Sequence, residues 1–159
     1  MQEDIDYLTS IYIPKDLNNK KDFYDFLNII EILRGENGCP WDREQTHESI
    51  KNNLLEECYE VVEAIEEDDI DSLIEELGDV LLQVLMHADM ARTDGWFNID
   101  DVANDICQKL IIRHPHVFGE VNVEGTEEVL TNWDNIKRKS KGQKTQGSSM
   151  LKVPRELPA

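Results

Sequence analysis

The chain has 159 residues, of which 40% are hydrophobic, enough for one domain with a proper core and too few for two. Its formal net charge of -18 at pH 7 argues against non-specific nucleic-acid binding, because such binding needs a cationic surface. No apolar run approaches the roughly 20 residues that span a bilayer, so we expect a soluble, cytoplasmic protein without a membrane partner.

Three cysteines lie far apart in the sequence and form no closely spaced pair. Such a set does not indicate a disulfide framework or a zinc site. We therefore expect Cys39, Cys58 and Cys107 to be small buried side chains in a reducing compartment.

The two ends of the chain differ in character from its middle. Residues 1–20 are expected to form a lead-in or linker, since Pro14 and the polar stretch after it interrupt any periodicity. Residues 141–159 are expected to form a flexible basic tail, rich in glycine, serine and lysine. The stretch between them, residues 21–140, is expected to be one folded domain.

The middle of the chain shows the apolar spacing of successive helices, and no stretch alternates as a strand does. A loop with Gly35, Gly38 and Pro40 follows the first helix and exposes Trp41. Thr46 is expected to cap the second helix. The expected helices cover approximately residues 22–33, 46–67, 72–90, 99–113 and 126–139. Short connections favour antiparallel neighbours, so the sequence predicts an all-α antiparallel bundle of four to five helices.

The expected helix at residues 72–90 is apolar almost all round, which is typical of a buried helix. Its polar residues fall mostly on one narrow stripe, made of Glu76, Asp79, Gln83 and His87. Two acids one turn apart in a buried helix are costly unless they are paired or bound to metal. No basic residue occurs between Lys51 and Arg92, so metal is the natural partner.

The preceding helix carries Glu56, Glu57 and Glu60 within an arc of roughly 100° on one side. For this helix alone, a solvated face explains the acids equally well. The tight turn expected at residues 68–71 packs the two helices antiparallel. Glu57 and Glu60 on the first of these helices can then face Glu76 and Asp79 on the second. Four carboxylates without histidine or thiolate suit Mg²⁺, with Mn²⁺ as a substitute, and indicate phosphoryl chemistry.

These acids lie in a pattern that resembles a known family. The pattern is Glu56-Glu57-x-x-Glu60, fifteen intervening residues, then Glu76-x-x-Asp79, flanked by Gly38-Cys-Pro-Trp-Asp42, Gln45-Thr46 and Arg113-His-Pro-His-Val-Phe118. Over roughly residues 22–140 the chain resembles the MazG-type nucleoside triphosphate pyrophosphohydrolases and their all-α relatives that hydrolyse dUTP and dCTP. The resemblance implies hydrolysis of a nucleoside triphosphate to the monophosphate and pyrophosphate. It also implies a homo-oligomer, either a dimer or a dimer of dimers, whose helices complete one another's core.

Carried over position by position, the resemblance makes four carboxylates the metal ligands: Glu57, Glu60, Glu76 and Asp79. Water would attack the α-phosphorus and expel pyrophosphate. The role of Glu56 stays open between orienting the water, acting as a general base and supporting the other acids.

Basic and aromatic residues further along resemble the family's Lys-x-x-x-Arg and Trp-x-x-x-Lys elements. These residues are Lys109, Arg113, Trp133 and Lys137. They are interpreted as a phosphate clamp, with Trp133 packing against the base or ribose. The alternative interpretation is a set of ordinary surface bases. Trp41 either stacks on a nucleobase or anchors its loop to the core, whereas His114 and His116 are expected to end a helix and to pack.

Three other classes of protein share parts of this pattern. A non-enzymatic acidic helical interaction or regulatory module explains the charge, but not the confinement of acids at residues 72–90. A di-iron bundle needs two Glu-x-x-His elements, and only Glu44-x-x-His47 fits. A calcium sensor needs a D-x-D-x-D-G loop, which does not occur in the sequence. The lead-in Ile5–Pro14 resembles a linker that follows a tetrapyrrole-methylase domain, so we expect a fragment of a longer protein.

Overall fold

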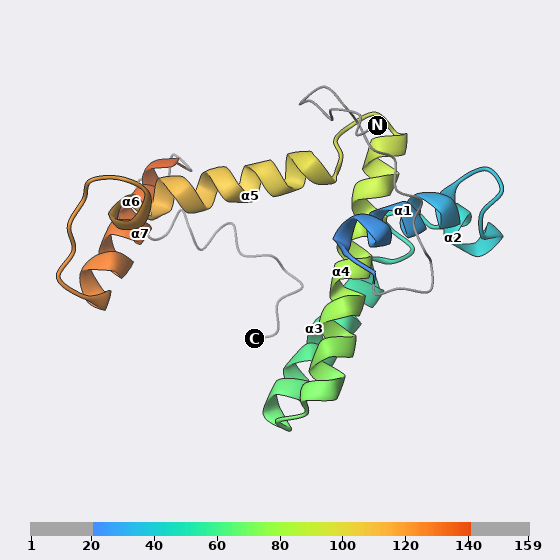
Figure 1. The fold of residues 1–159 in the computed structure, drawn as a ribbon, viewed down its shortest axis with the longest axis horizontal. Helices are drawn as coiled ribbons and strands as arrows, with labels where there is room; N and C mark the ends of the chain where they lie inside the picture. The colour runs from blue at the N-terminus through green and yellow to red at the C-terminus, as the bar shows by residue number, and fades with distance from the viewer. Residues whose placement is uncertain (1–20, 141–159) are drawn as a thin grey trace, which may run out of the picture. The chain divides into compact units, whose positions relative to one another are not determined.

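The computed structural model describes residues 21–140, and every regular element in that range is an α-helix. The helices in chain order are α1 (Phe23–Arg34), α2 (Pro40–Glu44), α3 (Lys51–Glu66), α4 (Ile70–Thr93), α5 (Ile99–Arg113), α6 (Pro115–Phe118) and α7 (Thr126–Ser140) (Figure 1). The prediction of an all-α fold is therefore confirmed. The predicted lead-in and the predicted tail lie outside the described residues.

The fold divides after Thr93 into two compact units, the first with α1 to α4 and the second with α5 to α7. The described part holds more helices than the four to five predicted, because α2 and α6 are additional. These two have only 5 and 4 residues. Helices of this length are too short to show a periodic apolar pattern, so the sequence did not predict them.

A reciprocal cap begins α1. The Asp25 N–H donates to Asp22 Oδ1 at 2.9 Å, and the Asp22 N–H donates to Asp25 Oδ2 at 3.0 Å. This capping box satisfies two backbone donors that would otherwise lack a partner. The helix then contacts α4 and places Ile30, which is 2% exposed, in the core of the first unit.

The chain reverses tightly after α1, where the loop folds back onto the end of the helix. The Cys39 N–H donates to the Leu33 carbonyl at 2.8 Å. A Cβ atom at Gly38 would lie 2.2 Å from the same carbonyl oxygen, so only glycine fits at this position. Trp41, which was expected in this loop, lies in α2 instead, because Pro40 suits the first position of a helix and opens α2.

The prediction that the second long helix begins at Thr46 is wrong, since α3 begins at Lys51. Thr46 and Ser49 form a separate turn, in which the Ser49 N–H donates to Thr46 Oγ1 at 3.2 Å and to the Thr46 carbonyl at 3.1 Å. The Ser49 hydroxyl also donates to Gln45 Oε1 at 2.7 Å. Such local side-chain bonds offer the backbone an alternative to the helix.

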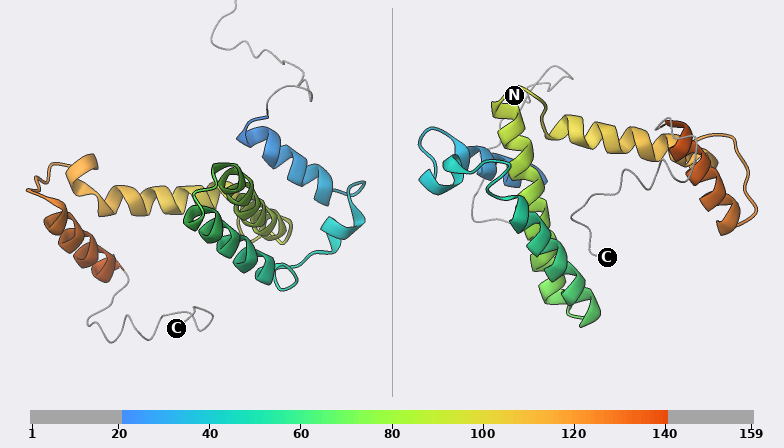
Figure 2. Two further views of the ribbon diagram at one scale, coloured as in Figure 1. Left: turned by 90° about the horizontal axis from the view of Figure 1, so that it is seen from below. Right: turned by 180° about the vertical axis from the view of Figure 1, so that it is seen from behind.

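Helices α3 and α4 lie side by side as an antiparallel hairpin (Figure 2). Asp69 holds the turn, since its Oδ1 accepts the N–H groups of Asp71 and Ser72, each at 3.1 Å. These bonds, led by that from the Ser72 backbone, lower the pKa of Asp69. Asp68 has a φ of 55°, a conformation that aspartate adopts more readily than most residues. The cap starts α4 at Ile70, two residues earlier than expected.

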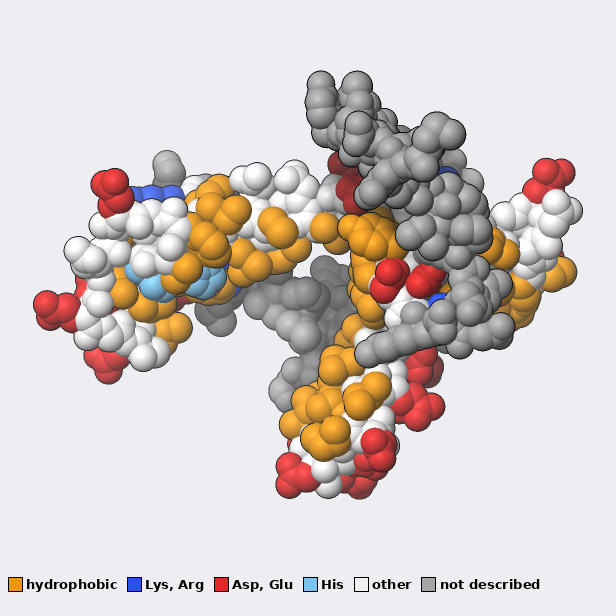
Figure 3. All heavy atoms as spheres, viewed as in Figure 1, with side chains coloured by type: hydrophobic (Ala, Val, Ile, Leu, Met, Phe, Trp, Pro, Cys, Tyr) orange, Lys and Arg blue, Asp and Glu red, His pale blue; other side chains and the backbone are white. Residues whose placement is uncertain are grey.

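The prediction that this long helix is buried is right only for its second half, within the described residues. Its buried residues are Gln83, Leu85, Met86, Ala88, Asp89, Met90 and Ala91. In the first half, Ile70, Ile74 and Leu77 are 65%, 68% and 52% exposed. Figure 3 shows hydrophobic side chains on the surface of the α3–α4 hairpin, next to its acidic side chains. Within the first unit, α1 to α3 leave this part of the apolar pattern uncovered.

A buried ion pair fastens α1 to α4. Arg34 Nε donates to Asp89 Oδ2 at 2.8 Å, and the two side chains are 8% and 6% exposed. Arg92 donates to the other carboxylate oxygen, with Nη2 2.6 Å from Oδ1. Arg34 also donates to the Asp42 carbonyl, which ties α2 to the same point. Both oxygens of the buried carboxylate are thus matched by cations, as a buried charge requires.

A second reciprocal cap begins α5. Asn98 Oδ1 accepts the N–H groups of Asp100 and Asp101 at 2.8 and 3.1 Å, and Asp101 accepts the Asn98 N–H at 3.0 Å. The helix ends at Arg113, as predicted, and Pro115 then opens α6. Within this unit α5 contacts both α6 and α7.

The prediction of buried cysteines is wrong for Cys58 and Cys107, which are exposed, whereas Cys39 is half-buried. Cys58 lies on α3 and Cys107 lies on α5. None of the described helices is both long and apolar enough to cross a membrane.

Candidate functional site

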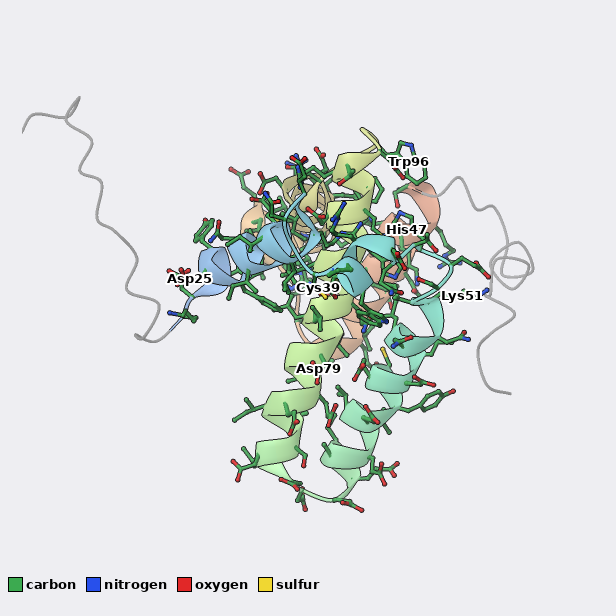
Figure 4. All side chains as sticks on the ribbon, turned by 90° about the vertical axis from the view of Figure 1, so that its right-hand side faces the viewer. Asp25, Cys39, His47, Lys51, Asp79 and Trp96 are labelled. Atoms are coloured by element: carbon green, nitrogen blue, oxygen red, sulfur yellow. The ribbon has the colours of Figure 1, made fainter. Side chains whose placement is uncertain are left out.

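Three carboxylates of the α3–α4 hairpin gather at one point. Glu57 of α3 and Glu76 and Asp79 of α4 place carboxylate oxygens within 4.8 Å of one another, and all three side chains are half-buried. Figure 4 shows Asp79 on the part of α4 that runs beside α3. Helix geometry explains the cluster, because Glu76 and Asp79 are one turn apart and share the face that the hairpin turns toward α3.

Glu60 borders this cluster, one turn beyond Glu57 on α3. It lines an open hollow of about 210 Å³, and Glu63, Glu67 and Glu76 line the same hollow. Glu56 is exposed and lies outside the group of three. Of the five predicted acids, the structure therefore brings three together, places the fourth at their edge and leaves Glu56 apart.

Partial burial and the neighbouring carboxylates together raise the pKa values of two acids of the cluster. Partial burial, followed by the charge of Asp79, raises the pKa of Glu57, and Glu60 contributes further. Partial burial also comes first in raising the pKa of Glu76, followed by the charges of Glu60, Glu75 and Asp79. The cluster thus resists carrying its full negative charge, and a cation bound there would relieve the repulsion.

The donor set of the cluster fits a hard divalent cation. Its ligand atoms are carboxylate oxygens alone, with no imidazole or thiolate. Magnesium and manganese prefer such oxygens, whereas zinc and copper favour nitrogen and sulfur. The residues that would hold the metal are Glu57, Glu76 and Asp79, with Glu60 beside them.

Magnesium affinity is expected to fall on acidification at pH values above the ordinary glutamate range. The pKa values of Glu57 and Glu76 are raised from 4.5, so protons compete with the metal at higher pH than at an isolated glutamate. The contribution of these two glutamates to the stability of the metal-free chain should change in the opposite sense. A raised pKa means that the folded state binds more protons than the unfolded state, so this contribution rises as the pH falls toward 4.5. His87 contributes with the other sign, because its lowered pKa makes the folded chain less stable as the pH falls through 6.5.

Calorimetric magnesium titrations and thermal unfolding, each run from neutral pH to about pH 5, measure these two effects. An affinity that stays constant over this window would contradict the assignment of the two glutamates to the metal.

A second set of predicted residues meets in the other unit, where α5 contacts α7. Arg113 Cζ lies 5.3 Å from the centroid of the Trp133 ring, and Lys137 Nζ lies 4.6 Å from it. Both distances are typical of cation–π contacts. Lys109, one turn before Arg113, instead pairs with Asp105 on its own helix. The structure thus brings three members of the predicted clamp together and leaves Lys109 engaged with a carboxylate.

Trp41 does not anchor its loop to the core, because its side chain is 62% exposed on α2. Stacking on a nucleobase stays its predicted role. His114 ends α5 as expected, with its Nδ1 2.7 Å from the Leu110 carbonyl oxygen.

Two histidines from distant parts of the chain meet in the first unit. His47 Nδ1 and His87 Nδ1 are 2.7 Å apart, and their rings stack at 5.0 Å with an angle of 4°. Burial, followed by the charge of His47, lowers the pKa of His87. The sequence places His87 on the polar stripe, but nothing in the sequence indicated its partner 40 residues away.

Residues 45–118 match the family model described as the MazG nucleotide pyrophosphohydrolase domain. This stretch includes the five candidate acids together with Lys109 and Arg113. Trp41, Trp133 and Lys137 lie outside it.

Two curated proteins are similar to most of the chain. It is 53% identical over 156 residues to the uncharacterized protein YabN of Bacillus subtilis (strain 168), covering 96% of this chain and 32% of that protein. It is 48% identical over 134 residues to a nucleoside triphosphate pyrophosphohydrolase of Escherichia coli (strain K12), covering 84% of this chain and 51% of that protein. The chain therefore spans about a third to a half of the length of these relatives.

A solved structure shares the fold. The crystal structure of a mazG-related protein from Thermotoga maritima matches with a TM-score of 0.61 and 30% sequence identity. The match covers 72% of this chain and 98% of that chain, so the similarity extends over almost the whole of the solved protein.

Proposed function

Because the chain belongs to the MazG domain family, we propose that it hydrolyses nucleoside triphosphates to nucleoside monophosphate and pyrophosphate, with magnesium as its metal. The cluster of Glu57, Glu76 and Asp79 carries this proposal. Half-buried acids with raised pKa values gain stability from a bound cation, and magnesium in proteins commonly shares substrate phosphates. The printed name of the Escherichia coli relative supports the same reaction.

In the proposed mechanism, water attacks the α-phosphorus and the bond from that phosphorus to the bridging oxygen breaks, so that pyrophosphate leaves. The residues that would hold the metal are Glu57, Glu60, Glu76 and Asp79. Bound magnesium would supply positive charge that polarises the phosphate and promotes ionisation of water. Glu56 is exposed and lies outside the group of three carboxylates, and its proposed role is to orient the water, to accept its proton or to support the other acids.

The basic residues of the second unit are proposed to contact the phosphates. The guanidinium of Arg113 offers several donors in one plane, which matches the oxygens of a phosphate. Lys137 supplies a mobile ammonium group. Lys109 has to exchange Asp105 for phosphate, and this exchange is easy because an exposed helical ion pair is weak.

We also propose a homo-oligomer built on a dimer. The support is the exposure of large apolar side chains on α3 and α4: Tyr59, Val62, Ile65, Ile74 and Leu77. Large apolar patches on a surface commonly mark contacts with another protein chain. A second copy of the hairpin would cover these side chains.

Product analysis of the purified chain tests the proposed reaction. The chain is incubated with a panel of ribo- and deoxyribonucleoside triphosphates, with magnesium or with a chelator, in water enriched in oxygen-18. We expect monophosphate and pyrophosphate only with magnesium, and the oxygen-18 label in the monophosphate, because water joins the phosphorus that it attacks.

Label in the pyrophosphate would place the attack at the β-phosphorus. Diphosphate and orthophosphate as products would place it at the γ-phosphorus, and either result contradicts the mechanism. A folded chain that binds magnesium but turns over none of the panel would instead favour an acidic binding or regulatory module.

A further inference from the structure

Trp133 lies between two helices and contacts a cation from each. Arg113 is the last residue of α5, and its Cζ is 5.3 Å from the ring centroid. Lys137 follows Trp133 by one turn on α7, and its Nζ is 4.6 Å from the same centroid. The half-buried indole ring therefore joins the end of one helix to the middle of another through positive charges.

An aromatic ring holds a cation without neutralising it. Among the described residues, neither Arg113 nor Lys137 forms an ion pair, whereas Lys109 is paired with Asp105. A cation that lies over a ring keeps its charge and its N–H donors for another partner. In a chain with a net charge of -18, a ring at this position keeps two cations from competing carboxylates.

We propose that Trp133 is a positioning residue, which acts on the phosphates of the substrate through Arg113 and Lys137 and does not stack on the nucleobase. A base that stacked on this ring would compete with the cations that already lie over it. The inference rests on the proposed function, in which both cations contact the triphosphate. It changes the role of the tryptophan from base recognition to phosphate recognition.

Two probes separate these roles. The first is inorganic tripolyphosphate, which has no base, and the second is a nucleoside triphosphate whose α–β bridge is a methylene group, so that it is not cleaved. Calorimetry at a fixed magnesium concentration measures the affinity of each probe for the full chain. We expect Trp133→Leu to weaken both probes by a similar factor of about tenfold, and Trp133→Phe to weaken both by less, because phenylalanine keeps a ring face. A loss confined to the nucleotide analogue would overturn the inference.

A double-mutant cycle distinguishes positioning from a merely structural role. In the Trp133→Leu background, Lys137→Met should cost less tripolyphosphate affinity than it costs in the wild type, since the lysine is no longer held. Lys139→Met removes the same charge from the same helix and should have additive effects. Full additivity of Trp133→Leu with Lys137→Met would overturn the inference.

The same measurements separate this inference from the proposed function. If Lys137→Met leaves tripolyphosphate binding unchanged, the proposed phosphate contacts fail, and the inference fails with them. If Lys137→Met weakens binding and Trp133→Leu does not, only the role assigned to the tryptophan fails.

Discussion

Asp79→Asn is expected to abolish magnesium-dependent turnover, by more than about a hundredfold, while the helical circular-dichroism signal stays unchanged. Asp79 offers one of the three carboxylate oxygens that meet between α3 and α4. The amide has nearly the same shape but lacks the negative charge, so the metal is held less firmly while the helix persists. Turnover assays and magnesium calorimetry on the same preparation measure both losses.

The matched control is Glu75→Gln, which removes the same charge from a position one turn earlier on the same helix. Glu75 affects the pKa of Glu76 but is not a member of the cluster. Its substitution should leave turnover close to that of the wild type. Near-normal turnover in Asp79→Asn would show that the assigned ligand set is wrong.

Asp79→Asn should also make the metal-free chain more stable. The charge of Asp79 is the second cause, after burial, of the raised pKa of Glu57, which means that the two acids repel each other. Removing one charge relieves that repulsion when no metal is present. Catalytic loss together with a higher metal-free Tm would identify a site kept for function at the expense of stability.

Asp89→Ala is expected to have the largest effect on stability, about 3–5 kcal/mol, because it leaves the buried guanidinium of Arg34 without its carboxylate. The two side chains are 8% and 6% exposed, so water cannot replace the lost partner. Chemical denaturation of the variant and the wild type measures the difference in unfolding free energy.

Glu31→Ala is the matched control, since it removes an exposed acid that pairs with Arg92. The distance from Arg92 Nε to Glu31 Oε1 is 3.8 Å, and those side chains are 49% and 58% exposed. This surface pair should contribute less than about 1 kcal/mol. Equal effects of Asp89→Ala and Glu31→Ala would contradict the importance assigned to the buried pair.

The long helices could be predicted from the sequence where local signals agree with packing. The predicted range of α5, residues 99–113, matches the structure, because a capping residue at Asn98 and Pro115 mark its two ends. The start of α3 could not be predicted, because the hydroxyls of Thr46 and Ser49 stabilise a turn that competes with the helix. Intrinsic preference alone does not decide between these two outcomes.

The candidate metal cluster could be predicted because every step is local. Glu76 and Asp79 share a helix face, and a short turn returns the chain alongside Glu57. The contact of Trp133 with Arg113 joins different helices, and sequence spacing does not report on packing between them. Sequence spacing also does not report which apolar side chains stay exposed to solvent, so the exposure of Ile74 was not expected.

The turn capped by Asp69 makes the site sensitive to chain length. One residue inserted between Asp69 and Glu76 would rotate the following acids by about 100° around the axis of α4, away from Glu57. A residue inserted before Lys51, where α3 begins, precedes both halves of the cluster and leaves their register intact. In evolutionary terms, the turn can accept exchanges of residues far more easily than a change in their number.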